Sequence, residues 1–297
     1  MAQSGFKRLA VIGLGLIGGS WALACRRTGG AAQVTGWDTD PGVLSAAVAM
    51  GCIDRAAGSL ADALAGADLV VLAAPPRAVL AMAPAVAEHV EPGALVTDTA
   101  STKRAVVARY EEALSGKAHF IGGHPMAGSE RSGLGAARPD LFHGMPYALT
   151  PTPRTDPQAL ARLEALVAAM GARPAVLRAE DHDRKVAAVS HLPQLTVWAM
   201  VRAALGDQEG EAGDSPLQLA GSGWRDTVRL AGSPAAMWRE VSMANADQID
   251  YYLSRLAGEV ALLRRLLAEG DEEGLERFFA GGRAWAGYGE ENDHGHG

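Results

Sequence analysis

The stretch FKRLAVIGLGLIG, at residues 6–18, decides the fold class of this chain. Its first half, from Phe6 to Ile12, is predicted to be a buried strand. Its second half carries glycines at Gly13, Gly15 and Gly18, and a helix is expected to follow from about residue 17 to residue 27. A strand, a glycine-rich turn and a helix in this order indicate the start of a βαβ unit.

The three glycines have the GxGxxG spacing of a dinucleotide-binding turn. In such a turn, Gly13 permits the tight bend, Gly15 lets the backbone approach a pyrophosphate, and Gly18 lets the helix pack closely on the strand. The first backbone N–H groups of the helix, including those of Leu16 and Ile17, are expected to face the phosphates. The spacing alone is weak, but the strand–turn–helix context is the one that the motif requires.

The next expected strand, Gln33–Trp37, ends at Asp38, 20 residues after Gly18. A carboxylate at this place accepts hydrogen bonds from the adenosine ribose hydroxyls, and its charge repels a 2′-phosphate. We therefore expect the cofactor to be NAD rather than NADP. Asp40 and Pro41 are predicted to start the following helix, as its cap and its first residue.

Further apolar strands recur within the first 180 residues and alternate with helical segments. Their continuous apolar character indicates a parallel sheet that is buried on both faces. The expected strands are Leu69–Ala73, Ala94–Thr97, His119–Ile121, Tyr147–Thr150 and Pro174–Leu177. Residues 1–180 are thus predicted to form a Rossmann-type α/β domain that binds NAD.

The pattern changes near Glu180, after which strand signals are few and helical periodicity is long. We expect an all-α C-terminal domain for substrate binding and dimerisation at residues 181–286, with a bend near Pro193, and a disordered tail at residues 287–297. One long helix has an apolar stripe that fits a homodimer interface, although packing within the chain is an alternative. Its members are Ile249, Leu253, Leu256, Val260 and Leu263.

Composition narrows the class of protein. The chain has 297 residues and a net charge of −7, which suits two domains and disfavours nucleic acid as a partner. Cys25 and Cys52 form neither a disulfide framework nor a CxxC motif, so we expect reduced thiols in a cytoplasmic protein. The uncharged stretch between Arg8 and Arg26 is too short for a membrane span and contains the glycine-rich turn, so no membrane association is expected. No metal site is expected.

Polar residues follow two of the expected strands. The segment Asp98–Lys103 comes after one strand, and Gly122–Glu130 comes after another. Ligands of an open α/β sheet bind outside the carboxyl ends of its strands, so Ser101 could lie near His124. An alternative is that Ser101 caps a helix starting near Thr102.

Two more polar motifs occur downstream, Ser190–Pro193 with His191 and Gly223–Arg229 with Arg225 and Arg229. A site with two histidines and two arginines suits a substrate that bears carboxylates, because the planar guanidinium group can bind both oxygens of a carboxylate.

In their order along the chain these motifs resemble the prephenate and arogenate dehydrogenase family. The resemblance covers about residues 6 to 280. The matching stretches are Gly13–Ser20, Asp98–Lys103, His124–Gly128, Ser190–Pro193 and Arg229–Arg239. The resemblance implies an enzyme of tyrosine biosynthesis that converts prephenate to 4-hydroxyphenylpyruvate while reducing NAD.

The resemblance also implies roles for single residues. His124 aligns with the catalytic histidine, which accepts the proton of the ring hydroxyl, and Ser101 aligns with a serine that helps to hold that hydroxyl. Arg229 aligns with an arginine that binds a substrate carboxylate, with Arg225 as the rival candidate. The other implied pocket residues are His191, Glu130 and Trp238, the last from either subunit of a dimer.

Other functions stay open. Gln194 stands where many prephenate-specific members have histidine, so arogenate, or both compounds, are alternative substrates. A different β-hydroxyacid or imino-acid oxidoreductase has the same two-domain plan, but the motif His124–Gly128 argues against it. A non-catalytic NAD-sensing protein is a further alternative, because a fold does not fix a function.

Overall fold

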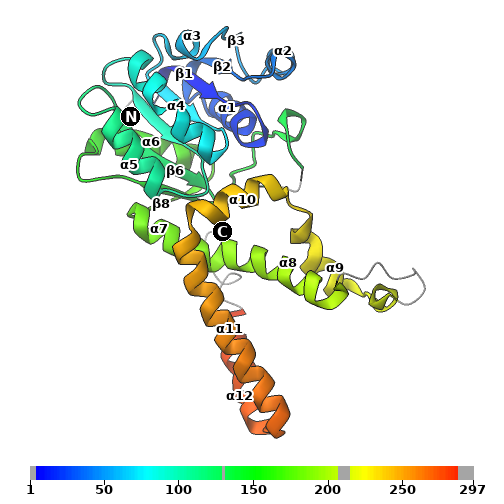
Figure 1. Cartoon of the computed structure of the whole chain (residues 1–297). Helices are drawn as coiled ribbons and strands as arrows, with labels where there is room; N and C mark the ends of the chain where they lie inside the picture. The colour runs from blue at the N-terminus through cyan, green and yellow to red at the C-terminus, as the bar shows by residue number, and fades with distance from the viewer. Residues whose placement is uncertain (1–4, 129–130, 207–214, 287–297) are drawn as a thin grey trace. The chain divides into compact units, whose positions relative to one another are not determined.

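The computed structural model describes residues 5–128, 131–206 and 215–286 (Figure 1). The chain divides into two compact units, Met1–Ala246 and Asp247–Gly297. The predicted α/β domain and the helical residues that follow it up to Ala246 belong to the first unit.

In the described residues, eight strands form one sheet in the order β3-β2-β1-β4-β5-β6-β7-β8. The strands are β1 (Phe6–Ile12), β2 (Ala31–Trp37), β3 (Arg55–Ala56), β4 (Leu69–Leu72), β5 (Leu95–Asp98), β6 (His119–Pro125), β7 (Pro146–Thr150) and β8 (Arg173–Val176). Every predicted strand is present close to its predicted bounds. β6 continues past Ile121 and includes His124, and the two-residue β3 was not predicted.

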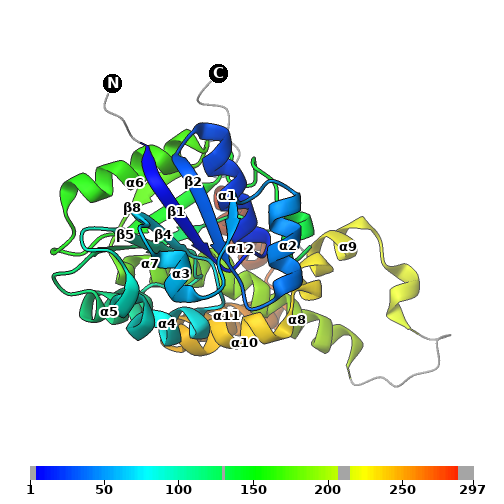
Figure 2. The ribbon, with the colours of Figure 1, turned by 90° about the horizontal axis from the view of Figure 1, so that it is seen from above.

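Helices cover both faces of the sheet (Figure 2). They are α1 (Leu16–Thr28), α2 (Pro41–Ala49), α3 (Leu60–Leu64), α4 (Pro76–His89), α5 (Arg104–Ala113) and α6 (Pro157–Ala169). Along β1, Leu9 and Val11 pack into the core with α1 and α6, whereas Ala10 and Ile12 pack into the core with α4 and α5. This alternation confirms a strand that is buried on both faces.

The strand order reverses at β1, which has β2 on one side and β4 on the other. Such a reversal opens a crevice at the carboxyl ends of the two central strands. The expected parallel pairing holds from β2 to β6, but β7 runs antiparallel to β6. In the described part of the connection between them, only the short 3-10 helix η1 (Leu134–Ala136) occurs, so no crossover helix returns the chain to the opposite edge.

The rest of the first unit is helical. Its elements are α7 (Ala179–Val186), the π-helical turn η2 (Ala187–His191), α8 (Leu192–Leu205), η3 (Pro216–Leu219), α9 (Ser222–Val228), η4 (Arg229–Gly232) and α10 (Ala235–Ala244). The π-helical turn ends at His191, two residues before Pro193, where a bend was expected. Proline has no N–H group to donate to Val189, four residues earlier, so the helical hydrogen bonds change register here.

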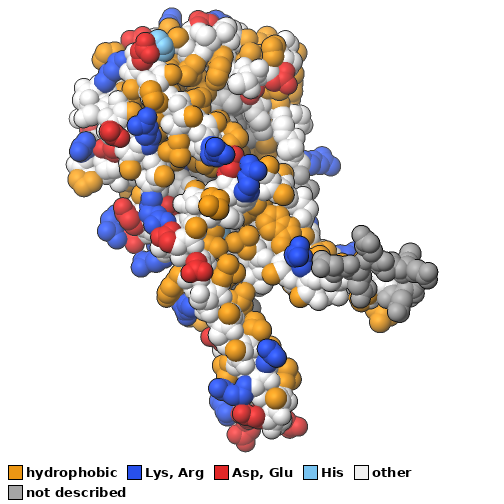
Figure 3. Space-filling view, viewed as in Figure 1, with side chains coloured by type: hydrophobic (Ala, Val, Ile, Leu, Met, Phe, Trp, Pro, Cys, Tyr) orange, Lys and Arg blue, Asp and Glu red, His pale blue; other side chains and the backbone are white. Residues whose placement is uncertain are grey.

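The second unit contains α11 (Ala246–Glu269) and α12 (Glu272–Ala286). Gly270, with φ of +66°, ends the first helix, and Asp271 caps the second by accepting the N–H of Gly274 at 2.8 Å. Apolar side chains lie among charged ones on the surface of this unit (Figure 3), and Val260 and Leu267 are 47% and 62% exposed. The expected tail at residues 287–297 lies outside the described residues.

Candidate active site

The glycine-rich turn between β1 and α1 lies at the carboxyl edge of the sheet. Gly13 has φ of +91°, and a Cβ atom there would lie 2.4 Å from the carbonyl oxygen of Ala73. A Cβ atom on Gly18 would lie 1.9 Å from the carbonyl oxygen of Gly13, so α1 starts this close to β1 only with glycine. In contrast, a Cβ atom on Gly15 would meet no atom within 4 Å. The turn thus has open space at Gly15, beside the start of the helix.

Gly15 is the N-cap of α1, and no side chain caps this helix end. The first N–H groups of the helix, including those of Leu16 and Ile17, have no acceptors within the helix itself. Together with the helix dipole they favour an anion. Open space and uncapped donors at the same place fit the pyrophosphate of a dinucleotide.

Asp38 follows β2 directly. One of its carboxylate oxygens accepts the N–H of Leu14 at 2.8 Å, and the other accepts the N–H of Asp40 at 3.0 Å. These bonds fix the carboxylate beside the glycine-rich turn. Each oxygen keeps a second lone pair, so Asp38 can still accept a hydrogen bond from a ribose hydroxyl. The predicted cap Asp40 accepts the N–H of Gly42 at 2.8 Å.

His124 lies near the carboxyl end of β6, at the same edge of the sheet as Gly13, and it is buried. Burial lowers the pKa of His124 well below its usual range, and its neighbours His182, Lys103 and His191 also disfavour a positive charge on the ring. The imidazole is therefore neutral at neutral pH, and it is able to accept a proton.

A chain of hydrogen bonds runs from His124 to His182 and on to Asp183, and the last two residues belong to α7. Nδ1 of His124 lies 2.8 Å from Nε2 of His182, and Nδ1 of His182 lies 2.8 Å from Oδ1 of Asp183. The two imidazole rings meet edge to face, with 5.0 Å between their centroids. Burial lowers the pKa of His182 although Asp183 opposes this shift, so the second imidazole is neutral as well.

Asp183 also holds the start of α5. Its carboxylate accepts the backbone N–H groups of Lys103 at 2.7 Å and Arg104 at 3.0 Å, and the Nε–H of Arg104 at 3.1 Å. Burial opposes ionisation of Asp183, but the hydrogen bonds from His182 and from these backbone groups outweigh it and lower the pKa. The carboxylate is therefore ionised and fixed in orientation.

Lys103 and Asp98 form a buried ion pair next to Gly123, the residue before His124. Nζ of Lys103 donates to the carbonyl oxygen of Gly123 at 2.7 Å, and Oδ1 of Asp98 accepts the N–H of Gly123 at 3.1 Å. Burial lowers the pKa of Lys103, and Asp98 opposes this shift. A Cβ atom on Gly123 would lie 2.5 Å from the carbonyl oxygen of Asp98. The ion pair and the glycine together fix the backbone that carries His124.

Ser101 lies between these two charged residues in the sequence and is half-buried. Its hydroxyl makes no hydrogen bond with the described residues. The alternative that Ser101 caps a helix is wrong, because α5 begins only at Arg104 and Asp183 takes up its first N–H groups. The hydroxyl is thus left available to a ligand.

His191 ends the π-helical turn and is buried. Burial lowers its pKa to about 4. Its Nδ1 lies 3.3 Å from the amide nitrogen of Asn245, which also donates to the backbone oxygen of Asp183 at 2.8 Å. The ring of Trp238 meets His191 edge to face at 5.8 Å. Both predicted pocket residues therefore belong to the same cluster as His182 and Asp183.

Arg229 and Arg225 are exposed, and neither guanidinium group forms a hydrogen bond or an ion pair with the described residues. No contact in the described chain brings them to His124. The start of η4 is held on α8 by Gln194, whose amide nitrogen donates to the carbonyl oxygen of Leu230 at 2.6 Å. Glu130 lies outside the described residues.

His182, Asp183 and Asn245 were not singled out from the sequence. The first two stand in the run Asp181-His182-Asp183, at the place where the pattern changes from mixed to helical. A histidine beside an aspartate at such a junction was the available signal. Nothing in the sequence connects Asn245 with them.

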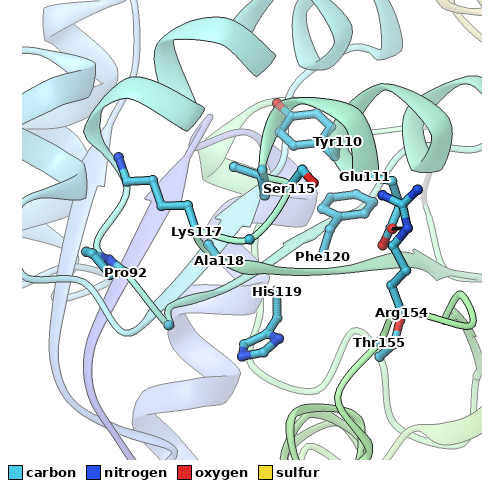
Figure 4. Close-up of a pocket in the computed structure, with 13 residues that line it drawn as sticks. Pro92, Tyr110, Glu111, Ser115, Lys117, Ala118, His119, Phe120, Arg154 and Thr155 are labelled. Atoms are coloured by element: carbon cyan, nitrogen blue, oxygen red, sulfur yellow. Dashed lines mark ion pairs between the residues drawn. The ribbon is translucent and has the colours of Figure 1, made fainter.

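A separate pocket of about 390 Å³ lies at the amino ends of the strands, away from the carboxyl ends that carry Gly13 and His124 (Figure 4). Lys117 and His119 line it at the start of β6, whereas His124 lies near the end of that strand. Its wall includes the stacked rings of Tyr110 and Phe120, 4.7 Å apart. This pocket is therefore distinct from the cluster around His124.

Two further properties concern the described residues only. None of their helices is both long enough and apolar enough to cross a membrane. Three or more histidine, cysteine, aspartate or glutamate side chains do not gather there in a way that could hold a metal ion.

Comparison with known protein families gives two adjacent matches. Residues 21–176 match the family described as "Prephenate dehydrogenase, nucleotide-binding domain", and residues 178–281 match "Prephenate dehydrogenase, dimerization domain". A prephenate dehydrogenase of Bacillus subtilis (strain 168) is 35% identical over 274 residues, which are 91% of this chain and 73% of that protein.

Two solved structures are similar over nearly the whole chain. Prephenate dehydrogenase from Aquifex aeolicus, in complex with hydroxyphenyl propionate and NAD+, has a TM-score of 0.85 and 29% identity, covering 92% of this chain and 95% of that one. Arogenate dehydrogenase from Synechocystis has a TM-score of 0.80 and 31% identity, covering 97% of this chain and 99% of that one.

Proposed function

The chain belongs to the prephenate dehydrogenase family, and on that basis we propose that it oxidises and decarboxylates prephenate to 4-hydroxyphenylpyruvate with reduction of NAD. The observation that carries this proposal is His124, a buried and neutral imidazole at the same sheet edge as an uncapped, glycine-rich helix start. A proton acceptor and a dinucleotide site at one edge suit hydride transfer from a hydroxyl-bearing carbon.

NAD is the cofactor that fits these residues. The open space at Gly15 and the first N–H groups of α1, including those of Leu16 and Ile17, would hold its pyrophosphate, and Asp38 would bind the adenosine ribose and disfavour a 2′-phosphate. When bound, NAD supplies the acceptor for the hydride.

His124 takes the proton of the ring hydroxyl while the hydride leaves the same carbon. A general base in this role typically contributes about 10²–10⁴-fold to the rate. Loss of the ring carboxylate as CO₂ leaves its electron pair in the ring, which becomes aromatic. Ser101, whose hydroxyl has no partner in the described chain, would hold the reacting hydroxyl beside His124.

The substrate carboxylates require cationic or donor side chains. We assign this role to Arg229, because its guanidinium group has no partner in the described chain, and Arg225 is the rival for the same reason. His191 and Trp238 would line the pocket, and Glu130 completes the proposed set. The arginines lie in the segment that matches the dimerization domain, so an approach from the partner subunit is compatible with the proposal.

Arogenate is the second candidate substrate. The similarity to the arogenate dehydrogenase of Synechocystis supports it, as does the glutamine at position 194. The amide of Gln194 is engaged by Leu230 and by Ser233, whose hydroxyl lies 3.4 Å from its Oε1. These two bonds hold the side chain of Gln194 against η4 and the residue that follows it.

The domain division and the dimer complete the proposal. We divide the chain into an NAD-binding domain at residues 1–180 and a helical substrate and dimerisation domain at residues 181–286, which agrees with the junction between the two family matches. A homodimer through the helical domain would cover apolar side chains such as Val260 and Leu267. Cys25 and Cys52 are free and buried, which suits a cytoplasmic location.

The direct test is NADH formation by the purified chain with prephenate and arogenate in parallel. We expect turnover of prephenate, and loss of it in His124→Asn with the binding of NAD retained. Turnover of arogenate alone would move the assignment to arogenate dehydrogenase. If NAD binds but neither compound reacts, the chain is not the enzyme proposed.

A further inference from the structure

We infer that His182 and Asp183 are positioning residues that hold His124 in the tautomer with hydrogen on Nδ1, so that Nε2 is the atom that accepts the substrate proton. This inference rests on the proposed function, in which His124 is the base. It assigns a role to two residues that the sequence did not single out.

The proton positions follow from the hydrogen-bonding capacity of each group. An ionised carboxylate only accepts, so the proton between Asp183 and His182 must belong to Nδ1 of His182. His182 is neutral, so its Nε2 then carries only a lone pair. The proton between the two imidazoles must therefore belong to Nδ1 of His124, 2.8 Å away. A neutral His124 is left with its lone pair on Nε2.

This arrangement is anchored at its far end. Asp183 accepts two backbone N–H groups at the start of α5, those of Lys103 and Arg104, and these cannot turn away as side chains can. The backbone oxygen of Asp183 accepts a further hydrogen bond from Asn245. Because one end of the chain of hydrogen bonds is fixed to the backbone, rotation of either imidazole would break a buried hydrogen bond.

The same arrangement responds when His124 takes up a proton. The charged and titratable groups around its ring are His182 and Asp183 from α7, Lys103 at the start of α5, Asp98 at the end of β5, and His191. Lys103 opposes a positive charge on His124. Asp183, acting through His182, favours a positive charge on His124. The proton on Nδ1 of His124 can shift toward Nε2 of His182, while the proton on Nδ1 of His182 stays bonded to the carboxylate of Asp183.

The alternative tautomer shows why positioning matters. With hydrogen on Nε2, His124 would present a donor to the substrate hydroxyl and could not accept its proton there. Without an acceptor at position 182, the buried Nδ1–H of His124 would have no partner, and the other tautomer would be favoured. A glutamine at position 182 could still accept from Nδ1, because its carbonyl oxygen can occupy the place of Nε2.

The test uses the full-length protein labelled with 15N in its histidines. Long-range 1H–15N spectra separate protonated from unprotonated ring nitrogens, and His124→Asn identifies the His124 signals. We expect hydrogen on Nδ1 of His124 in the native protein and in His182→Gln, and a shift toward Nε2 in His182→Leu. His89→Gln, a change on half-exposed α4 surface, is the control and keeps the native pattern.

Kinetics give the second readout. His182→Leu should lower kcat by about 10²-fold or more with a change in KM below about threefold, and His182→Gln should recover at least about tenfold of that loss. A native His124 with hydrogen on Nε2, or native kcat in His182→Leu, would overturn the inference. If His182→Leu does not fold, the native spectrum and His182→Gln still decide. Hydrogen on Nδ1 with no turnover of either substrate would support the positioning and reject the proposed function.

Discussion

The ammonium group of Lys103 donates a hydrogen bond to the carbonyl oxygen of Gly123, 2.7 Å away, while it forms a buried ion pair with Asp98. This contact joins the segment after β5 to the end of β6. Because Gly123 directly precedes His124, the position of the proposed base depends on a lysine that is itself far from the exposed surface.

Lys103→Met is expected to destabilise the fold strongly. The change leaves the buried carboxylate of Asp98 without its partner, and breaking a buried ion pair on one side costs about 3–5 kcal/mol. Urea unfolding measures the loss. Lys185→Met, which removes an exposed lysine, should change the free energy of unfolding by less than about 0.5 kcal/mol. Equal stability of the two variants would show that the buried pair contributes nothing.

Gly15→Ala is expected to weaken NAD binding without affecting stability. A Cβ atom at this position meets no atom of the chain within 4 Å, but it would occupy the space proposed for the pyrophosphate. The dissociation constant of NAD should rise about tenfold or more, equivalent to about 1.4 kcal/mol, at an unchanged midpoint of thermal unfolding. Gly123→Ala is the contrasting variant, since its Cβ would lie 2.5 Å from a backbone oxygen and should impair folding. Unchanged NAD binding in Gly15→Ala would place the pyrophosphate elsewhere.

Asp38→Ala is expected to lower the preference for NAD over NADP. Hydrogen bonds to a charged group contribute about 1.5–3 kcal/mol, so kcat/KM with NAD should fall about 10- to 150-fold. The value with NADP should fall less, because the charge that repels a 2′-phosphate is removed. Asp40→Ala removes the cap of α2 and serves as the control, costing about 1 kcal/mol of stability at an unchanged cofactor preference. The same ratio of activities in Asp38→Ala and the native enzyme would contradict the account of specificity.

Acidification is expected to destabilise the protein partly through His191. Its folded pKa of about 4 lies below the ordinary value of 6.5, so the unfolded chain binds the proton more readily. This destabilisation of the folded state is absent above the ordinary pKa. It grows as the pH falls from about 6.5 to about 4, where it reaches about 3 kcal/mol. Across this pH range, the free energy of unfolding should fall less with decreasing pH for His191→Gln than for the native chain. His89→Gln should follow the native curve, and a His191→Gln curve as steep as the native one would refute this explanation.

Local patterns predicted much of the fold. The strand from Phe6 to Ile12, the cap at Asp40 and the change near Glu180 depend on neighbours in the sequence, and the structure has all three. The direction of β7 was not predictable in this way. It depends on the path of a connection of about 20 residues that carries no clear helical or strand period.

The proposed site was predictable only in part. Motifs pointed to His124 and His191, and both lie in one buried cluster. His182 is 58 residues from its partner His124, and their contact depends on tertiary packing that no periodicity reveals. Lys103 was known from a motif, but lysines are almost never fully buried, so its place in the core could not be expected.

The capping of α5 by Asp183 bears on how such a protein could arise by recombination of gene segments. The helix start belongs to the segment that matches the nucleotide-binding family, and the carboxylate belongs to the segment that matches the dimerization family. A fragment expressed from the first segment alone would lack an acceptor for Nδ1 of His124 and would have uncapped N–H groups at residues 103 and 104. An exchange of either segment would therefore have to bring a matching histidine–aspartate pair with it.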